Sequence, residues 1–178
     1  MRVYLPVTAS ALTAALRSAS LTGGSDGLLL AHAVTPALRE WYTEGDTEEL
    51  ELAAMLDAAL SSLRRLAAEG EGSPPRRLVL AADVPEPAVR VAAPGSDEEP
   101  RSAVLVVAPL PLSVVVSAHV DEAEAEPDVV AAMEALPAAD AGDEDAQFTV
   151  DGADGHDLLW YDATELAELT QELGQPGR

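Results

Sequence analysis

The chain contains three histidines, His32, His119 and His156. Histidine is the residue whose ordinary side-chain pKa lies closest to neutral pH. Each lies in or beside a segment predicted as a strand, so the fold could bring them together as a metal site or an acid–base group. Their spacing matches no helical H-x-x-x-H pattern. Aspartates within two residues of His119 and His156 could orient an imidazole, although such neighbours are common among 32 acidic residues. Structural or surface histidines are the alternative.

Two short motifs resemble known sites but lack their essential features. Residues 23–27 match the G-x-S-x-G pattern of hydrolases, in which a strand precedes the nucleophilic serine and a helix follows it. Here the predicted order is reversed, so the pattern around Ser25 indicates a turn. Residues 151–157 resemble a calcium loop, but Ala153 and Gly155 stand where an EF-hand needs oxygen ligands. This second segment is predicted to be an acidic turn.

The chain contains no Lys, Cys, Asn or Ile. Without Lys it cannot form a Schiff base or hold a phosphate through a Walker-type lysine. Without Cys, thiolate nucleophiles, disulfides, iron–sulfur clusters and cysteine-based zinc sites are excluded. A GC-rich genome favours the codons of Ala, Gly, Pro and Arg, which accounts for much of this composition. We assign no catalytic residue, metal ligand or cofactor from the sequence.

Two aromatic dipeptides, Trp41-Tyr42 and Trp160-Tyr161, are notable because only 3% of the residues are aromatic. One member of each pair can enter the core while the other borders the surface. These four residues and three polar ones form the candidate pocket or contact patch: His32, Arg39, Trp41, Tyr42, His156, Trp160 and Tyr161. The alternative is that the aromatic residues only fill an Ala-rich core.

Acidic residues dominate the second half of the chain. The net charge is −22, and 17 of the 32 acidic residues lie within 102–177, a stretch without Arg or Lys. Such a surface repels phosphate backbones and anionic head groups, so binding to nucleic acid and docking to membranes are both disfavoured. The acids either keep an Ala-rich protein soluble, steer it toward a protein partner with a basic surface, or mimic nucleic acid.

No targeting segment is visible in the sequence. The first residues lack the long apolar run of a signal peptide. The longest nearly apolar stretch, 103–116, contains two prolines and is shorter than the ~20 residues that cross a bilayer. We therefore expect a cytoplasmic protein.

Hydrophobic periodicity predicts alternating strands and helices. The clearest helix is 47–68, which carries a leucine stripe and begins with a capping box at Asp46 and Glu49. Strands are expected at 2–7, 28–34, 77–84, 88–92, 103–108, 114–120, 147–150 and 158–161. Further helices are expected after Thr8, at 35–41, at about 127–136, and after a second capping box at Asp162 and Glu165.

This order of elements predicts one α/β domain over 1–173, in which helices cover a mixed β-sheet; an α+β arrangement is the alternative. The apolar fraction of 48% is too high for an intrinsically disordered chain despite the charge. Acidic loops near 94–101 and 137–146 are expected to be mobile, and residues 174–178 are expected to form a disordered tail.

Four segments carry a resemblance to known proteins. Residues 31–42, 80–84, 146–152 and 158–161 read AHAVTPALREWY, LAADV, AQFTVDG and LLWY. Together they resemble an uncharacterised family of small actinobacterial proteins, a domain of unknown function, over nearly the whole chain. The resemblance implies an actinobacterial cytoplasmic protein and implies no activity.

The function predicted from the sequence is that of a non-enzymatic acidic domain, which binds or regulates a protein partner with a basic surface. The main support is that no complete catalytic constellation is present. The alternative is a small-molecule-binding protein or enzyme with a pocket around His32, Arg39, Trp41, His156 and Trp160.

Overall fold

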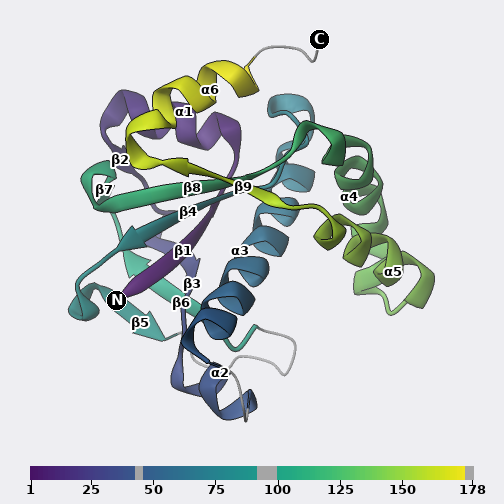
Figure 1. The fold of residues 1–178 in the computed structure, drawn as a ribbon, viewed down its shortest axis with the longest axis horizontal. Coiled ribbons are helices and arrows are strands. Elements are labelled where there is room, and N and C mark those ends of the chain that lie inside the picture. Colours follow the sequence, from purple (N-terminus) through teal and green to yellow (C-terminus); the bar gives the residue numbers. More distant parts are fainter. Residues whose placement is uncertain (43–45, 92–99, 175–178) are drawn as a thin grey trace.

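Strand β1 (Arg2–Val7) lies in the middle of a seven-stranded sheet. The structure is a computed structural model that describes residues 1–42, 46–91 and 100–174. The strand order is β5-β6-β3-β1-β4-β8-β9 (Figure 1), and every described strand pair is antiparallel. The predicted fold class, a sheet covered by helices, is confirmed. The antiparallel pairing corresponds to the α+β alternative rather than to a mixed sheet.

The elements follow one another in an order close to the predicted one. The remaining strands are β2 (Ser20–Leu21), β3 (Leu28–His32), β4 (Leu78–Asp83), β5 (Val89–Val91), β6 (Ala103–Val107), β7 (Leu110–Pro111), β8 (Val115–Asp121) and β9 (Leu158–Asp162). The helices are α1 (Ala9–Ser18), α2 (Pro36–Trp41), α3 (Thr47–Glu69), α4 (Glu126–Asp140), α5 (Glu144–Gly152) and α6 (Leu166–Leu173). Short 3₁₀ turns lie at Gly70–Gly72, Glu86–Ala88, Leu112–Val114, Ala123–Ala125, Ala153–Gly155 and Ala163–Glu165.

Residues of β1 alternate between two apolar cores on opposite faces of the sheet. Val3, Leu5 and Val7 belong to the first core, in which the sheet packs against α1 and α6. Tyr4 belongs to the second core, which α3 covers. Figure 1 shows α1 and α6 lying together against the sheet, and α3 crossing the sheet apart from them. Because helices cover both faces, β1 is buried along nearly its whole length.

Helix α3 begins with the capping box that the sequence predicts. The Asp46 carboxylate accepts a hydrogen bond from the Glu49 amide at 2.9 Å, and the Glu49 carboxylate accepts one from the Asp46 amide at 3.0 Å. Farther along the helix, Leu50 and Ala54 face the sheet, whereas Leu66 joins a third core with α4 and α5. One helix therefore connects the sheet to the α4–α5 pair.

The acidic loop expected at 137–146 is wrong, because this segment contains the end of α4 and the start of α5. Helix α4 continues through Pro137 to Asp140, and α5 begins at Glu144, so only residues 141–143 lie between them. The physical reason is a local cap, because the Asp143 carboxylate accepts a hydrogen bond from the Ala146 amide at 3.0 Å.

The strand expected at 147–150 is also wrong, because this segment belongs to α5. The apolar residues Phe148 and Val150 are spaced as on one face of a strand. In the structure only Val150 is buried, and Phe148 is 81% exposed.

Of the other predicted flexible segments, residues 94–99 and 175–178 lie outside the described residues.

A buried ion pair links Arg77, the residue directly before β4, to Asp121, the last residue of β8. Their side chains are 1% and 0% exposed. Arg77 Nη2 lies 2.9 Å from Asp121 Oδ1, and Arg77 Nε lies 3.0 Å from Asp121 Oδ2. The guanidinium also donates to the Ala153 carbonyl at 2.6 Å and to the Asp154 carboxylate. The pair is therefore fully hydrogen-bonded, which is what allows two charges to be buried.

Replacing Arg77 with Met should destabilise the protein by about 3–5 kcal/mol, because Asp121 would remain buried without a counter-ion. The matched control is Arg64→Met. Arg64 pairs with Asp140 at 2.7 Å on the surface, where both side chains are about half exposed, and such a pair contributes about 1 kcal/mol or less. Urea titrations give the free energies of unfolding. Equal losses in the two variants would contradict this role of the buried pair.

Candidate functional site

Strands β1 and β3 separate toward one end and leave a pocket between them. Tyr4 and His32 form the single register pair described for these two strands. Continuing that register would place Pro6 opposite Leu30, where no pair is described. Pro6 has no amide hydrogen to donate to a neighbouring strand. The sheet therefore opens beyond Tyr4, and both Pro6 and Leu30 line the opening.

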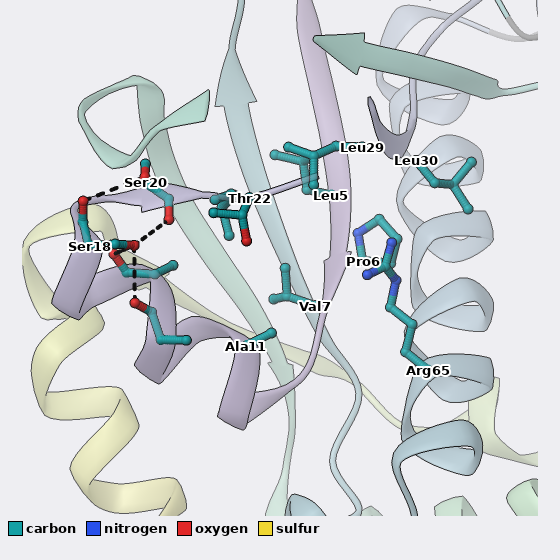
Figure 2. Close-up of a pocket in the computed structure, with 13 residues that line it drawn as sticks. Leu5, Pro6, Val7, Ala11, Ser18, Ser20, Thr22, Leu29, Leu30 and Arg65 are labelled. Atoms are coloured by element: carbon teal, nitrogen blue, oxygen red, sulfur yellow. Dashed lines mark hydrogen bonds between the residues drawn. The ribbon is translucent and has the colours of Figure 1, made fainter. Parts of the chain in front are cut away.

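The pocket has a volume of about 340 Å³ and a mainly apolar lining (Figure 2). Strands β1 and β3 contribute Leu5, Val7 and Leu29, and α1 contributes Ala11 and Ala15. A volume near this value lies at the lower end of the range for small-molecule sites, roughly 300–1,000 Å³. The dimensions suit a metabolite-sized ligand with an apolar body.

Arg65 is the one charged side chain in the lining of this pocket. It extends from α3 in the direction of Pro6 (Figure 2). Burial lowers the pKa of the Arg65 guanidinium, which means that the charged form has lost part of its hydration. Four other arginines contact carboxylates: Arg2, Arg64, Arg76 and Arg77. Arg65 forms no such ion pair with any residue that the structure describes, so its donors are available to a ligand.

Arg65 belongs to a polar stripe on α3. Asp57, Ser61 and Arg65 are spaced by four residues, which places them on one face of the helix. The site residues predicted from the sequence include none of the three. Their spacing is a signal that the sequence does contain, but polar stripes on helices are usually solvated. Only the packing of α3 against β3 turns this stripe toward the interior.

A chain of hydrogen bonds links Asp57 to Ser61 through Ser102 and His32. The Ser102 hydroxyl donates to Asp57 Oδ2 at 2.6 Å, so Ser102 Oγ is the acceptor for His32 Nδ1–H at 2.8 Å. His32 Nε2 in turn accepts a hydrogen bond from the Ser61 hydroxyl at 2.9 Å. This network assigns a neutral imidazole with its proton on Nδ1.

Ser61 and His32 have the separation of a nucleophile and its general base, but their surroundings do not suit catalysis. Burial, with a smaller contribution from Arg65, lowers the pKa of His32 to about 4. The imidazole is then a weak base at neutral pH. Its Nδ1 also faces a serine, whereas a catalytic triad places a carboxylate there. The network therefore joins α3 to β3 and to Ser102, the residue before β6.

His156, one of the predicted site residues, lies between two carboxylates. Its Nε2 is 2.7 Å from Asp128 Oδ2, and its Nδ1 is 3.1 Å from Glu122 Oε1. Hydrogen bonds to Asp128 and Glu122 raise the pKa of His156. In the protonated form both ring nitrogens donate, which leaves no lone pair for a metal ion. His156 thus fastens the turn before β9 to α4.

The predicted residues around α2 lie on the surface. Trp41 is 64% exposed, and the Arg101 guanidinium stacks over its ring at 4.1 Å from the centroid. Arg39 and Tyr42 are exposed beside it. His32, by contrast, is buried between β3 and α3.

Trp160 and Tyr161 occupy the edge strand β9 and face opposite sides of the sheet. Trp160 pairs in register with His119 and is 60% exposed, whereas Tyr161 packs partly against the α1–α6 core. Strand β9 lies four positions from β3, a separation of roughly 19 Å at normal strand spacing. The seven predicted residues therefore form no common site, and the pocket lining includes none of them.

Two further features are absent from the described residues. No group of three or more His, Cys, Asp or Glu side chains there is arranged to hold a metal ion. None of the helices in that part of the chain combines the length and the apolar character that crossing a membrane requires.

The depressed pKa of His32 predicts a specific loss of stability in acid. Between about pH 6.5 and pH 4 the unfolded chain binds a proton at His32 and the folded protein does not. The free energy of unfolding should therefore fall as the pH is lowered, by up to about 1.4 kcal/mol per pH unit from this residue. His32→Gln should lack this component. Urea titrations of both proteins at several pH values in this window test it, and parallel pH dependence would contradict a buried neutral imidazole.

Comparison with known proteins identifies a family and no activity. The matching family model is described as a family of unknown function (DUF6912) and covers residues 1–170. That match includes every strand described above and most of the helical residues. No curated protein and no solved structure matches the chain.

Proposed function

We propose that this chain, which belongs to the family of unknown function DUF6912, binds a small organic carboxylate in the pocket between β1 and β3. The Arg65 guanidinium holds the carboxylate through charge-assisted hydrogen bonds. The apolar side chains of β1, β3 and α1 contact the body of the ligand. The role of the protein is then that of a binding protein for an amphipathic anion.

The observation that carries this proposal is that the Arg65 guanidinium is partly buried and forms no ion pair with a described residue. Four other arginines, Arg17, Arg39, Arg90 and Arg101, also form no ion pair with a described residue, but all four are exposed. Exposed arginines are satisfied by water, but Arg65 is half-buried and partly desolvated. A charge that has lost part of its hydration without gaining a counter-ion is destabilised relative to one in water. An anionic ligand would remove that cost, and the apolar lining beside Arg65 defines the rest of the ligand.

The overall charge of the protein limits which anions can bind. A net charge of −22 creates a long-range field that opposes the approach of an anion. Salt screens that field over about 8 Å at physiological ionic strength, whereas the contact with Arg65 acts at hydrogen-bond distance. Burial of apolar surface must therefore supply much of the binding free energy. This favours a carboxylate with an apolar body over a small inorganic anion.

The hydrogen-bond network beside the pocket prepares Arg65 for this role. Ser61 is held by His32 one helical turn before Arg65, so the backbone of α3 has a defined distance from β3. Burial of the neighbouring residues Leu63 and Leu66 keeps that part of α3 fixed. A guanidinium that is already positioned loses less conformational entropy when a ligand binds.

The proposal is tested with octanoate and with octanol, its uncharged counterpart. Octanoate should bind more tightly to the wild-type protein, and Arg65→Met should remove that preference with a loss of about 2 kcal/mol, as expected for a hydrogen bond to a charged group. Isothermal titration calorimetry measures both ligands. Arg64→Met is the matched control, because it removes the neighbouring arginine that pairs with Asp140 at the surface.

Two results would refute binding at this site. One is equal affinity of the wild-type protein for octanoate and octanol. The other is an unchanged affinity for octanoate in the Arg65→Met variant. Circular dichroism of each variant establishes that it is folded before its affinity is compared with that of the wild-type protein.

We also propose that the protein acts in the cytoplasm of an actinobacterium. The support is the resemblance in four sequence segments, together with a composition typical of a GC-rich genome. Fractionation of a native host, with detection by an antibody against the purified protein, tests this location. Recovery from the membrane or the culture medium would contradict it.

A further inference from the structure

The two edges of the seven-stranded sheet differ in how they are protected against pairing with another chain. At one edge, β5 has only three residues, carries the exposed Arg90 at its centre, and follows Pro85 and Pro87. Short strands, charges and prolines are the usual means of blocking a sheet edge. At the other edge, β9 has five residues, and its first four, Leu-Leu-Trp-Tyr, are uncharged.

Apolar side chains of β9 are exposed on both faces of the sheet. Trp160 is 60% exposed on one face, and Leu159 is 40% exposed on the other. Strand β9 pairs with β8 on its inner side, and no described strand pairs with its outer side (Figure 1). The outer side thus offers backbone hydrogen-bonding groups between exposed apolar side chains. This is the arrangement to which an extended peptide adds as a further strand.

The surroundings of β9 are strongly acidic. Six acidic residues and no Arg or Lys lie within 154–172. Asp157 and Asp162 stand at the two ends of the apolar segment. A strand that alternates apolar and basic residues would match both features, because its apolar side chains would cover Trp160 or Leu159 while its cations face the carboxylates.

We propose that β9 is a docking strand for an extended basic segment of a partner protein. The backbone of the segment pairs with the outer side of β9. Its apolar side chains lie on one face, where they contact Trp160 or Leu159, and its basic side chains lie on the other. This site is separate from the pocket, since three strand spacings lie between β9 and β1. It also gives a location to the basic partner that the acidic composition predicts.

A second copy of the chain fits this edge less well. If two β9 strands paired antiparallel about Trp160, Asp157 and Asp162 of both copies would be brought to the two ends of the paired segment. Carboxylates gathered in this way repel one another. Each copy would also bring a net charge of −22 to the contact. Charge complementarity therefore favours a basic segment over self-association.

The probe for this site is a fluorescent ten-residue peptide that alternates arginine and valine. Its affinity for the full chain is measured by anisotropy at about 150 mM salt, where surface attraction is largely screened. Leu159→Lys should weaken binding by about tenfold, which corresponds to roughly 1.4 kcal/mol. The matched control is Leu52→Lys, which makes the same charge change at a side chain of α3 that is 51% exposed and should preserve the wild-type affinity.

Amide hydrogen exchange locates the contact. The bound peptide should protect backbone amides of β9, and a peptide with proline at its centre should fail to do so, because proline removes a donor from the added strand.

Equal weakening by Leu159→Lys and Leu52→Lys would overturn the proposal in favour of unspecific attraction to an acidic surface. Peptide binding without protection of β9 would also overturn it, as would light scattering that shows a dimer lost in Leu159→Lys. The octanoate affinity of Leu159→Lys should equal that of the wild-type protein, which separates this test from that of the pocket.

Discussion

The burial of β1 and β4 on both faces is the constraint on which the rest of the structure depends. Apolar residues at alternate positions of these strands belong to two different cores, so helices must cover both sides of the sheet. Helices α1 and α6 meet this requirement on one face, and α3 meets it on the other. The length of α3 then allows its second half to hold α4 and α5 through a third core. The remaining strands and helices are arranged around these two central strands.

Pro6 is the exception within the central strand, and the pocket is its consequence. The residue is buried and keeps its register with β4, but it cannot donate a hydrogen bond. Strand β3 pairs with β1 only at Tyr4 and diverges beyond it. Residues of α1 and the Arg65 side chain line the resulting pocket. A local defect in the sheet thus places a cation beside an apolar pocket.

The excess of acidic residues makes the position of each arginine informative. Among the exposed arginines, Arg2 and Arg64 pair with a carboxylate, whereas Arg17, Arg39, Arg90 and Arg101 form no ion pair with a described residue and are hydrated instead. Arg77 is inside the protein, where its hydrogen bonds to Asp121 offset the cost of dehydration. Arg65 is intermediate, since it is partly dehydrated and forms no ion pair with a described residue. Partial burial without an ion pair therefore singles it out among the described arginines.

Local patterns in the sequence were sufficient to predict most of the elements. The capping boxes at Asp46 and Asp162 and the leucine stripe of α3 involve residues within a few positions of each other, so their physical chemistry is visible without the fold. Apolar spacing failed at 147–150, because Phe148 and Val150 fit a strand as well as a short helix whose apolar side is only partly buried. The predicted site residues failed to converge because their proximity depended on a strand order that no local pattern contains.

The sequence by itself determined the charge, the missing chemistries and the amphipathic segments, because each of these is a property of single residues or short windows. Only the tertiary structure decided what the polar residues do. Arg64 and Arg65 are neighbours on one helix, yet one pairs with Asp140 at the surface and the other borders the pocket. His32 meets Ser102 across 70 positions of the chain. Such contacts depend on how α3 lies across the sheet, and that orientation arises from the packing of the whole core.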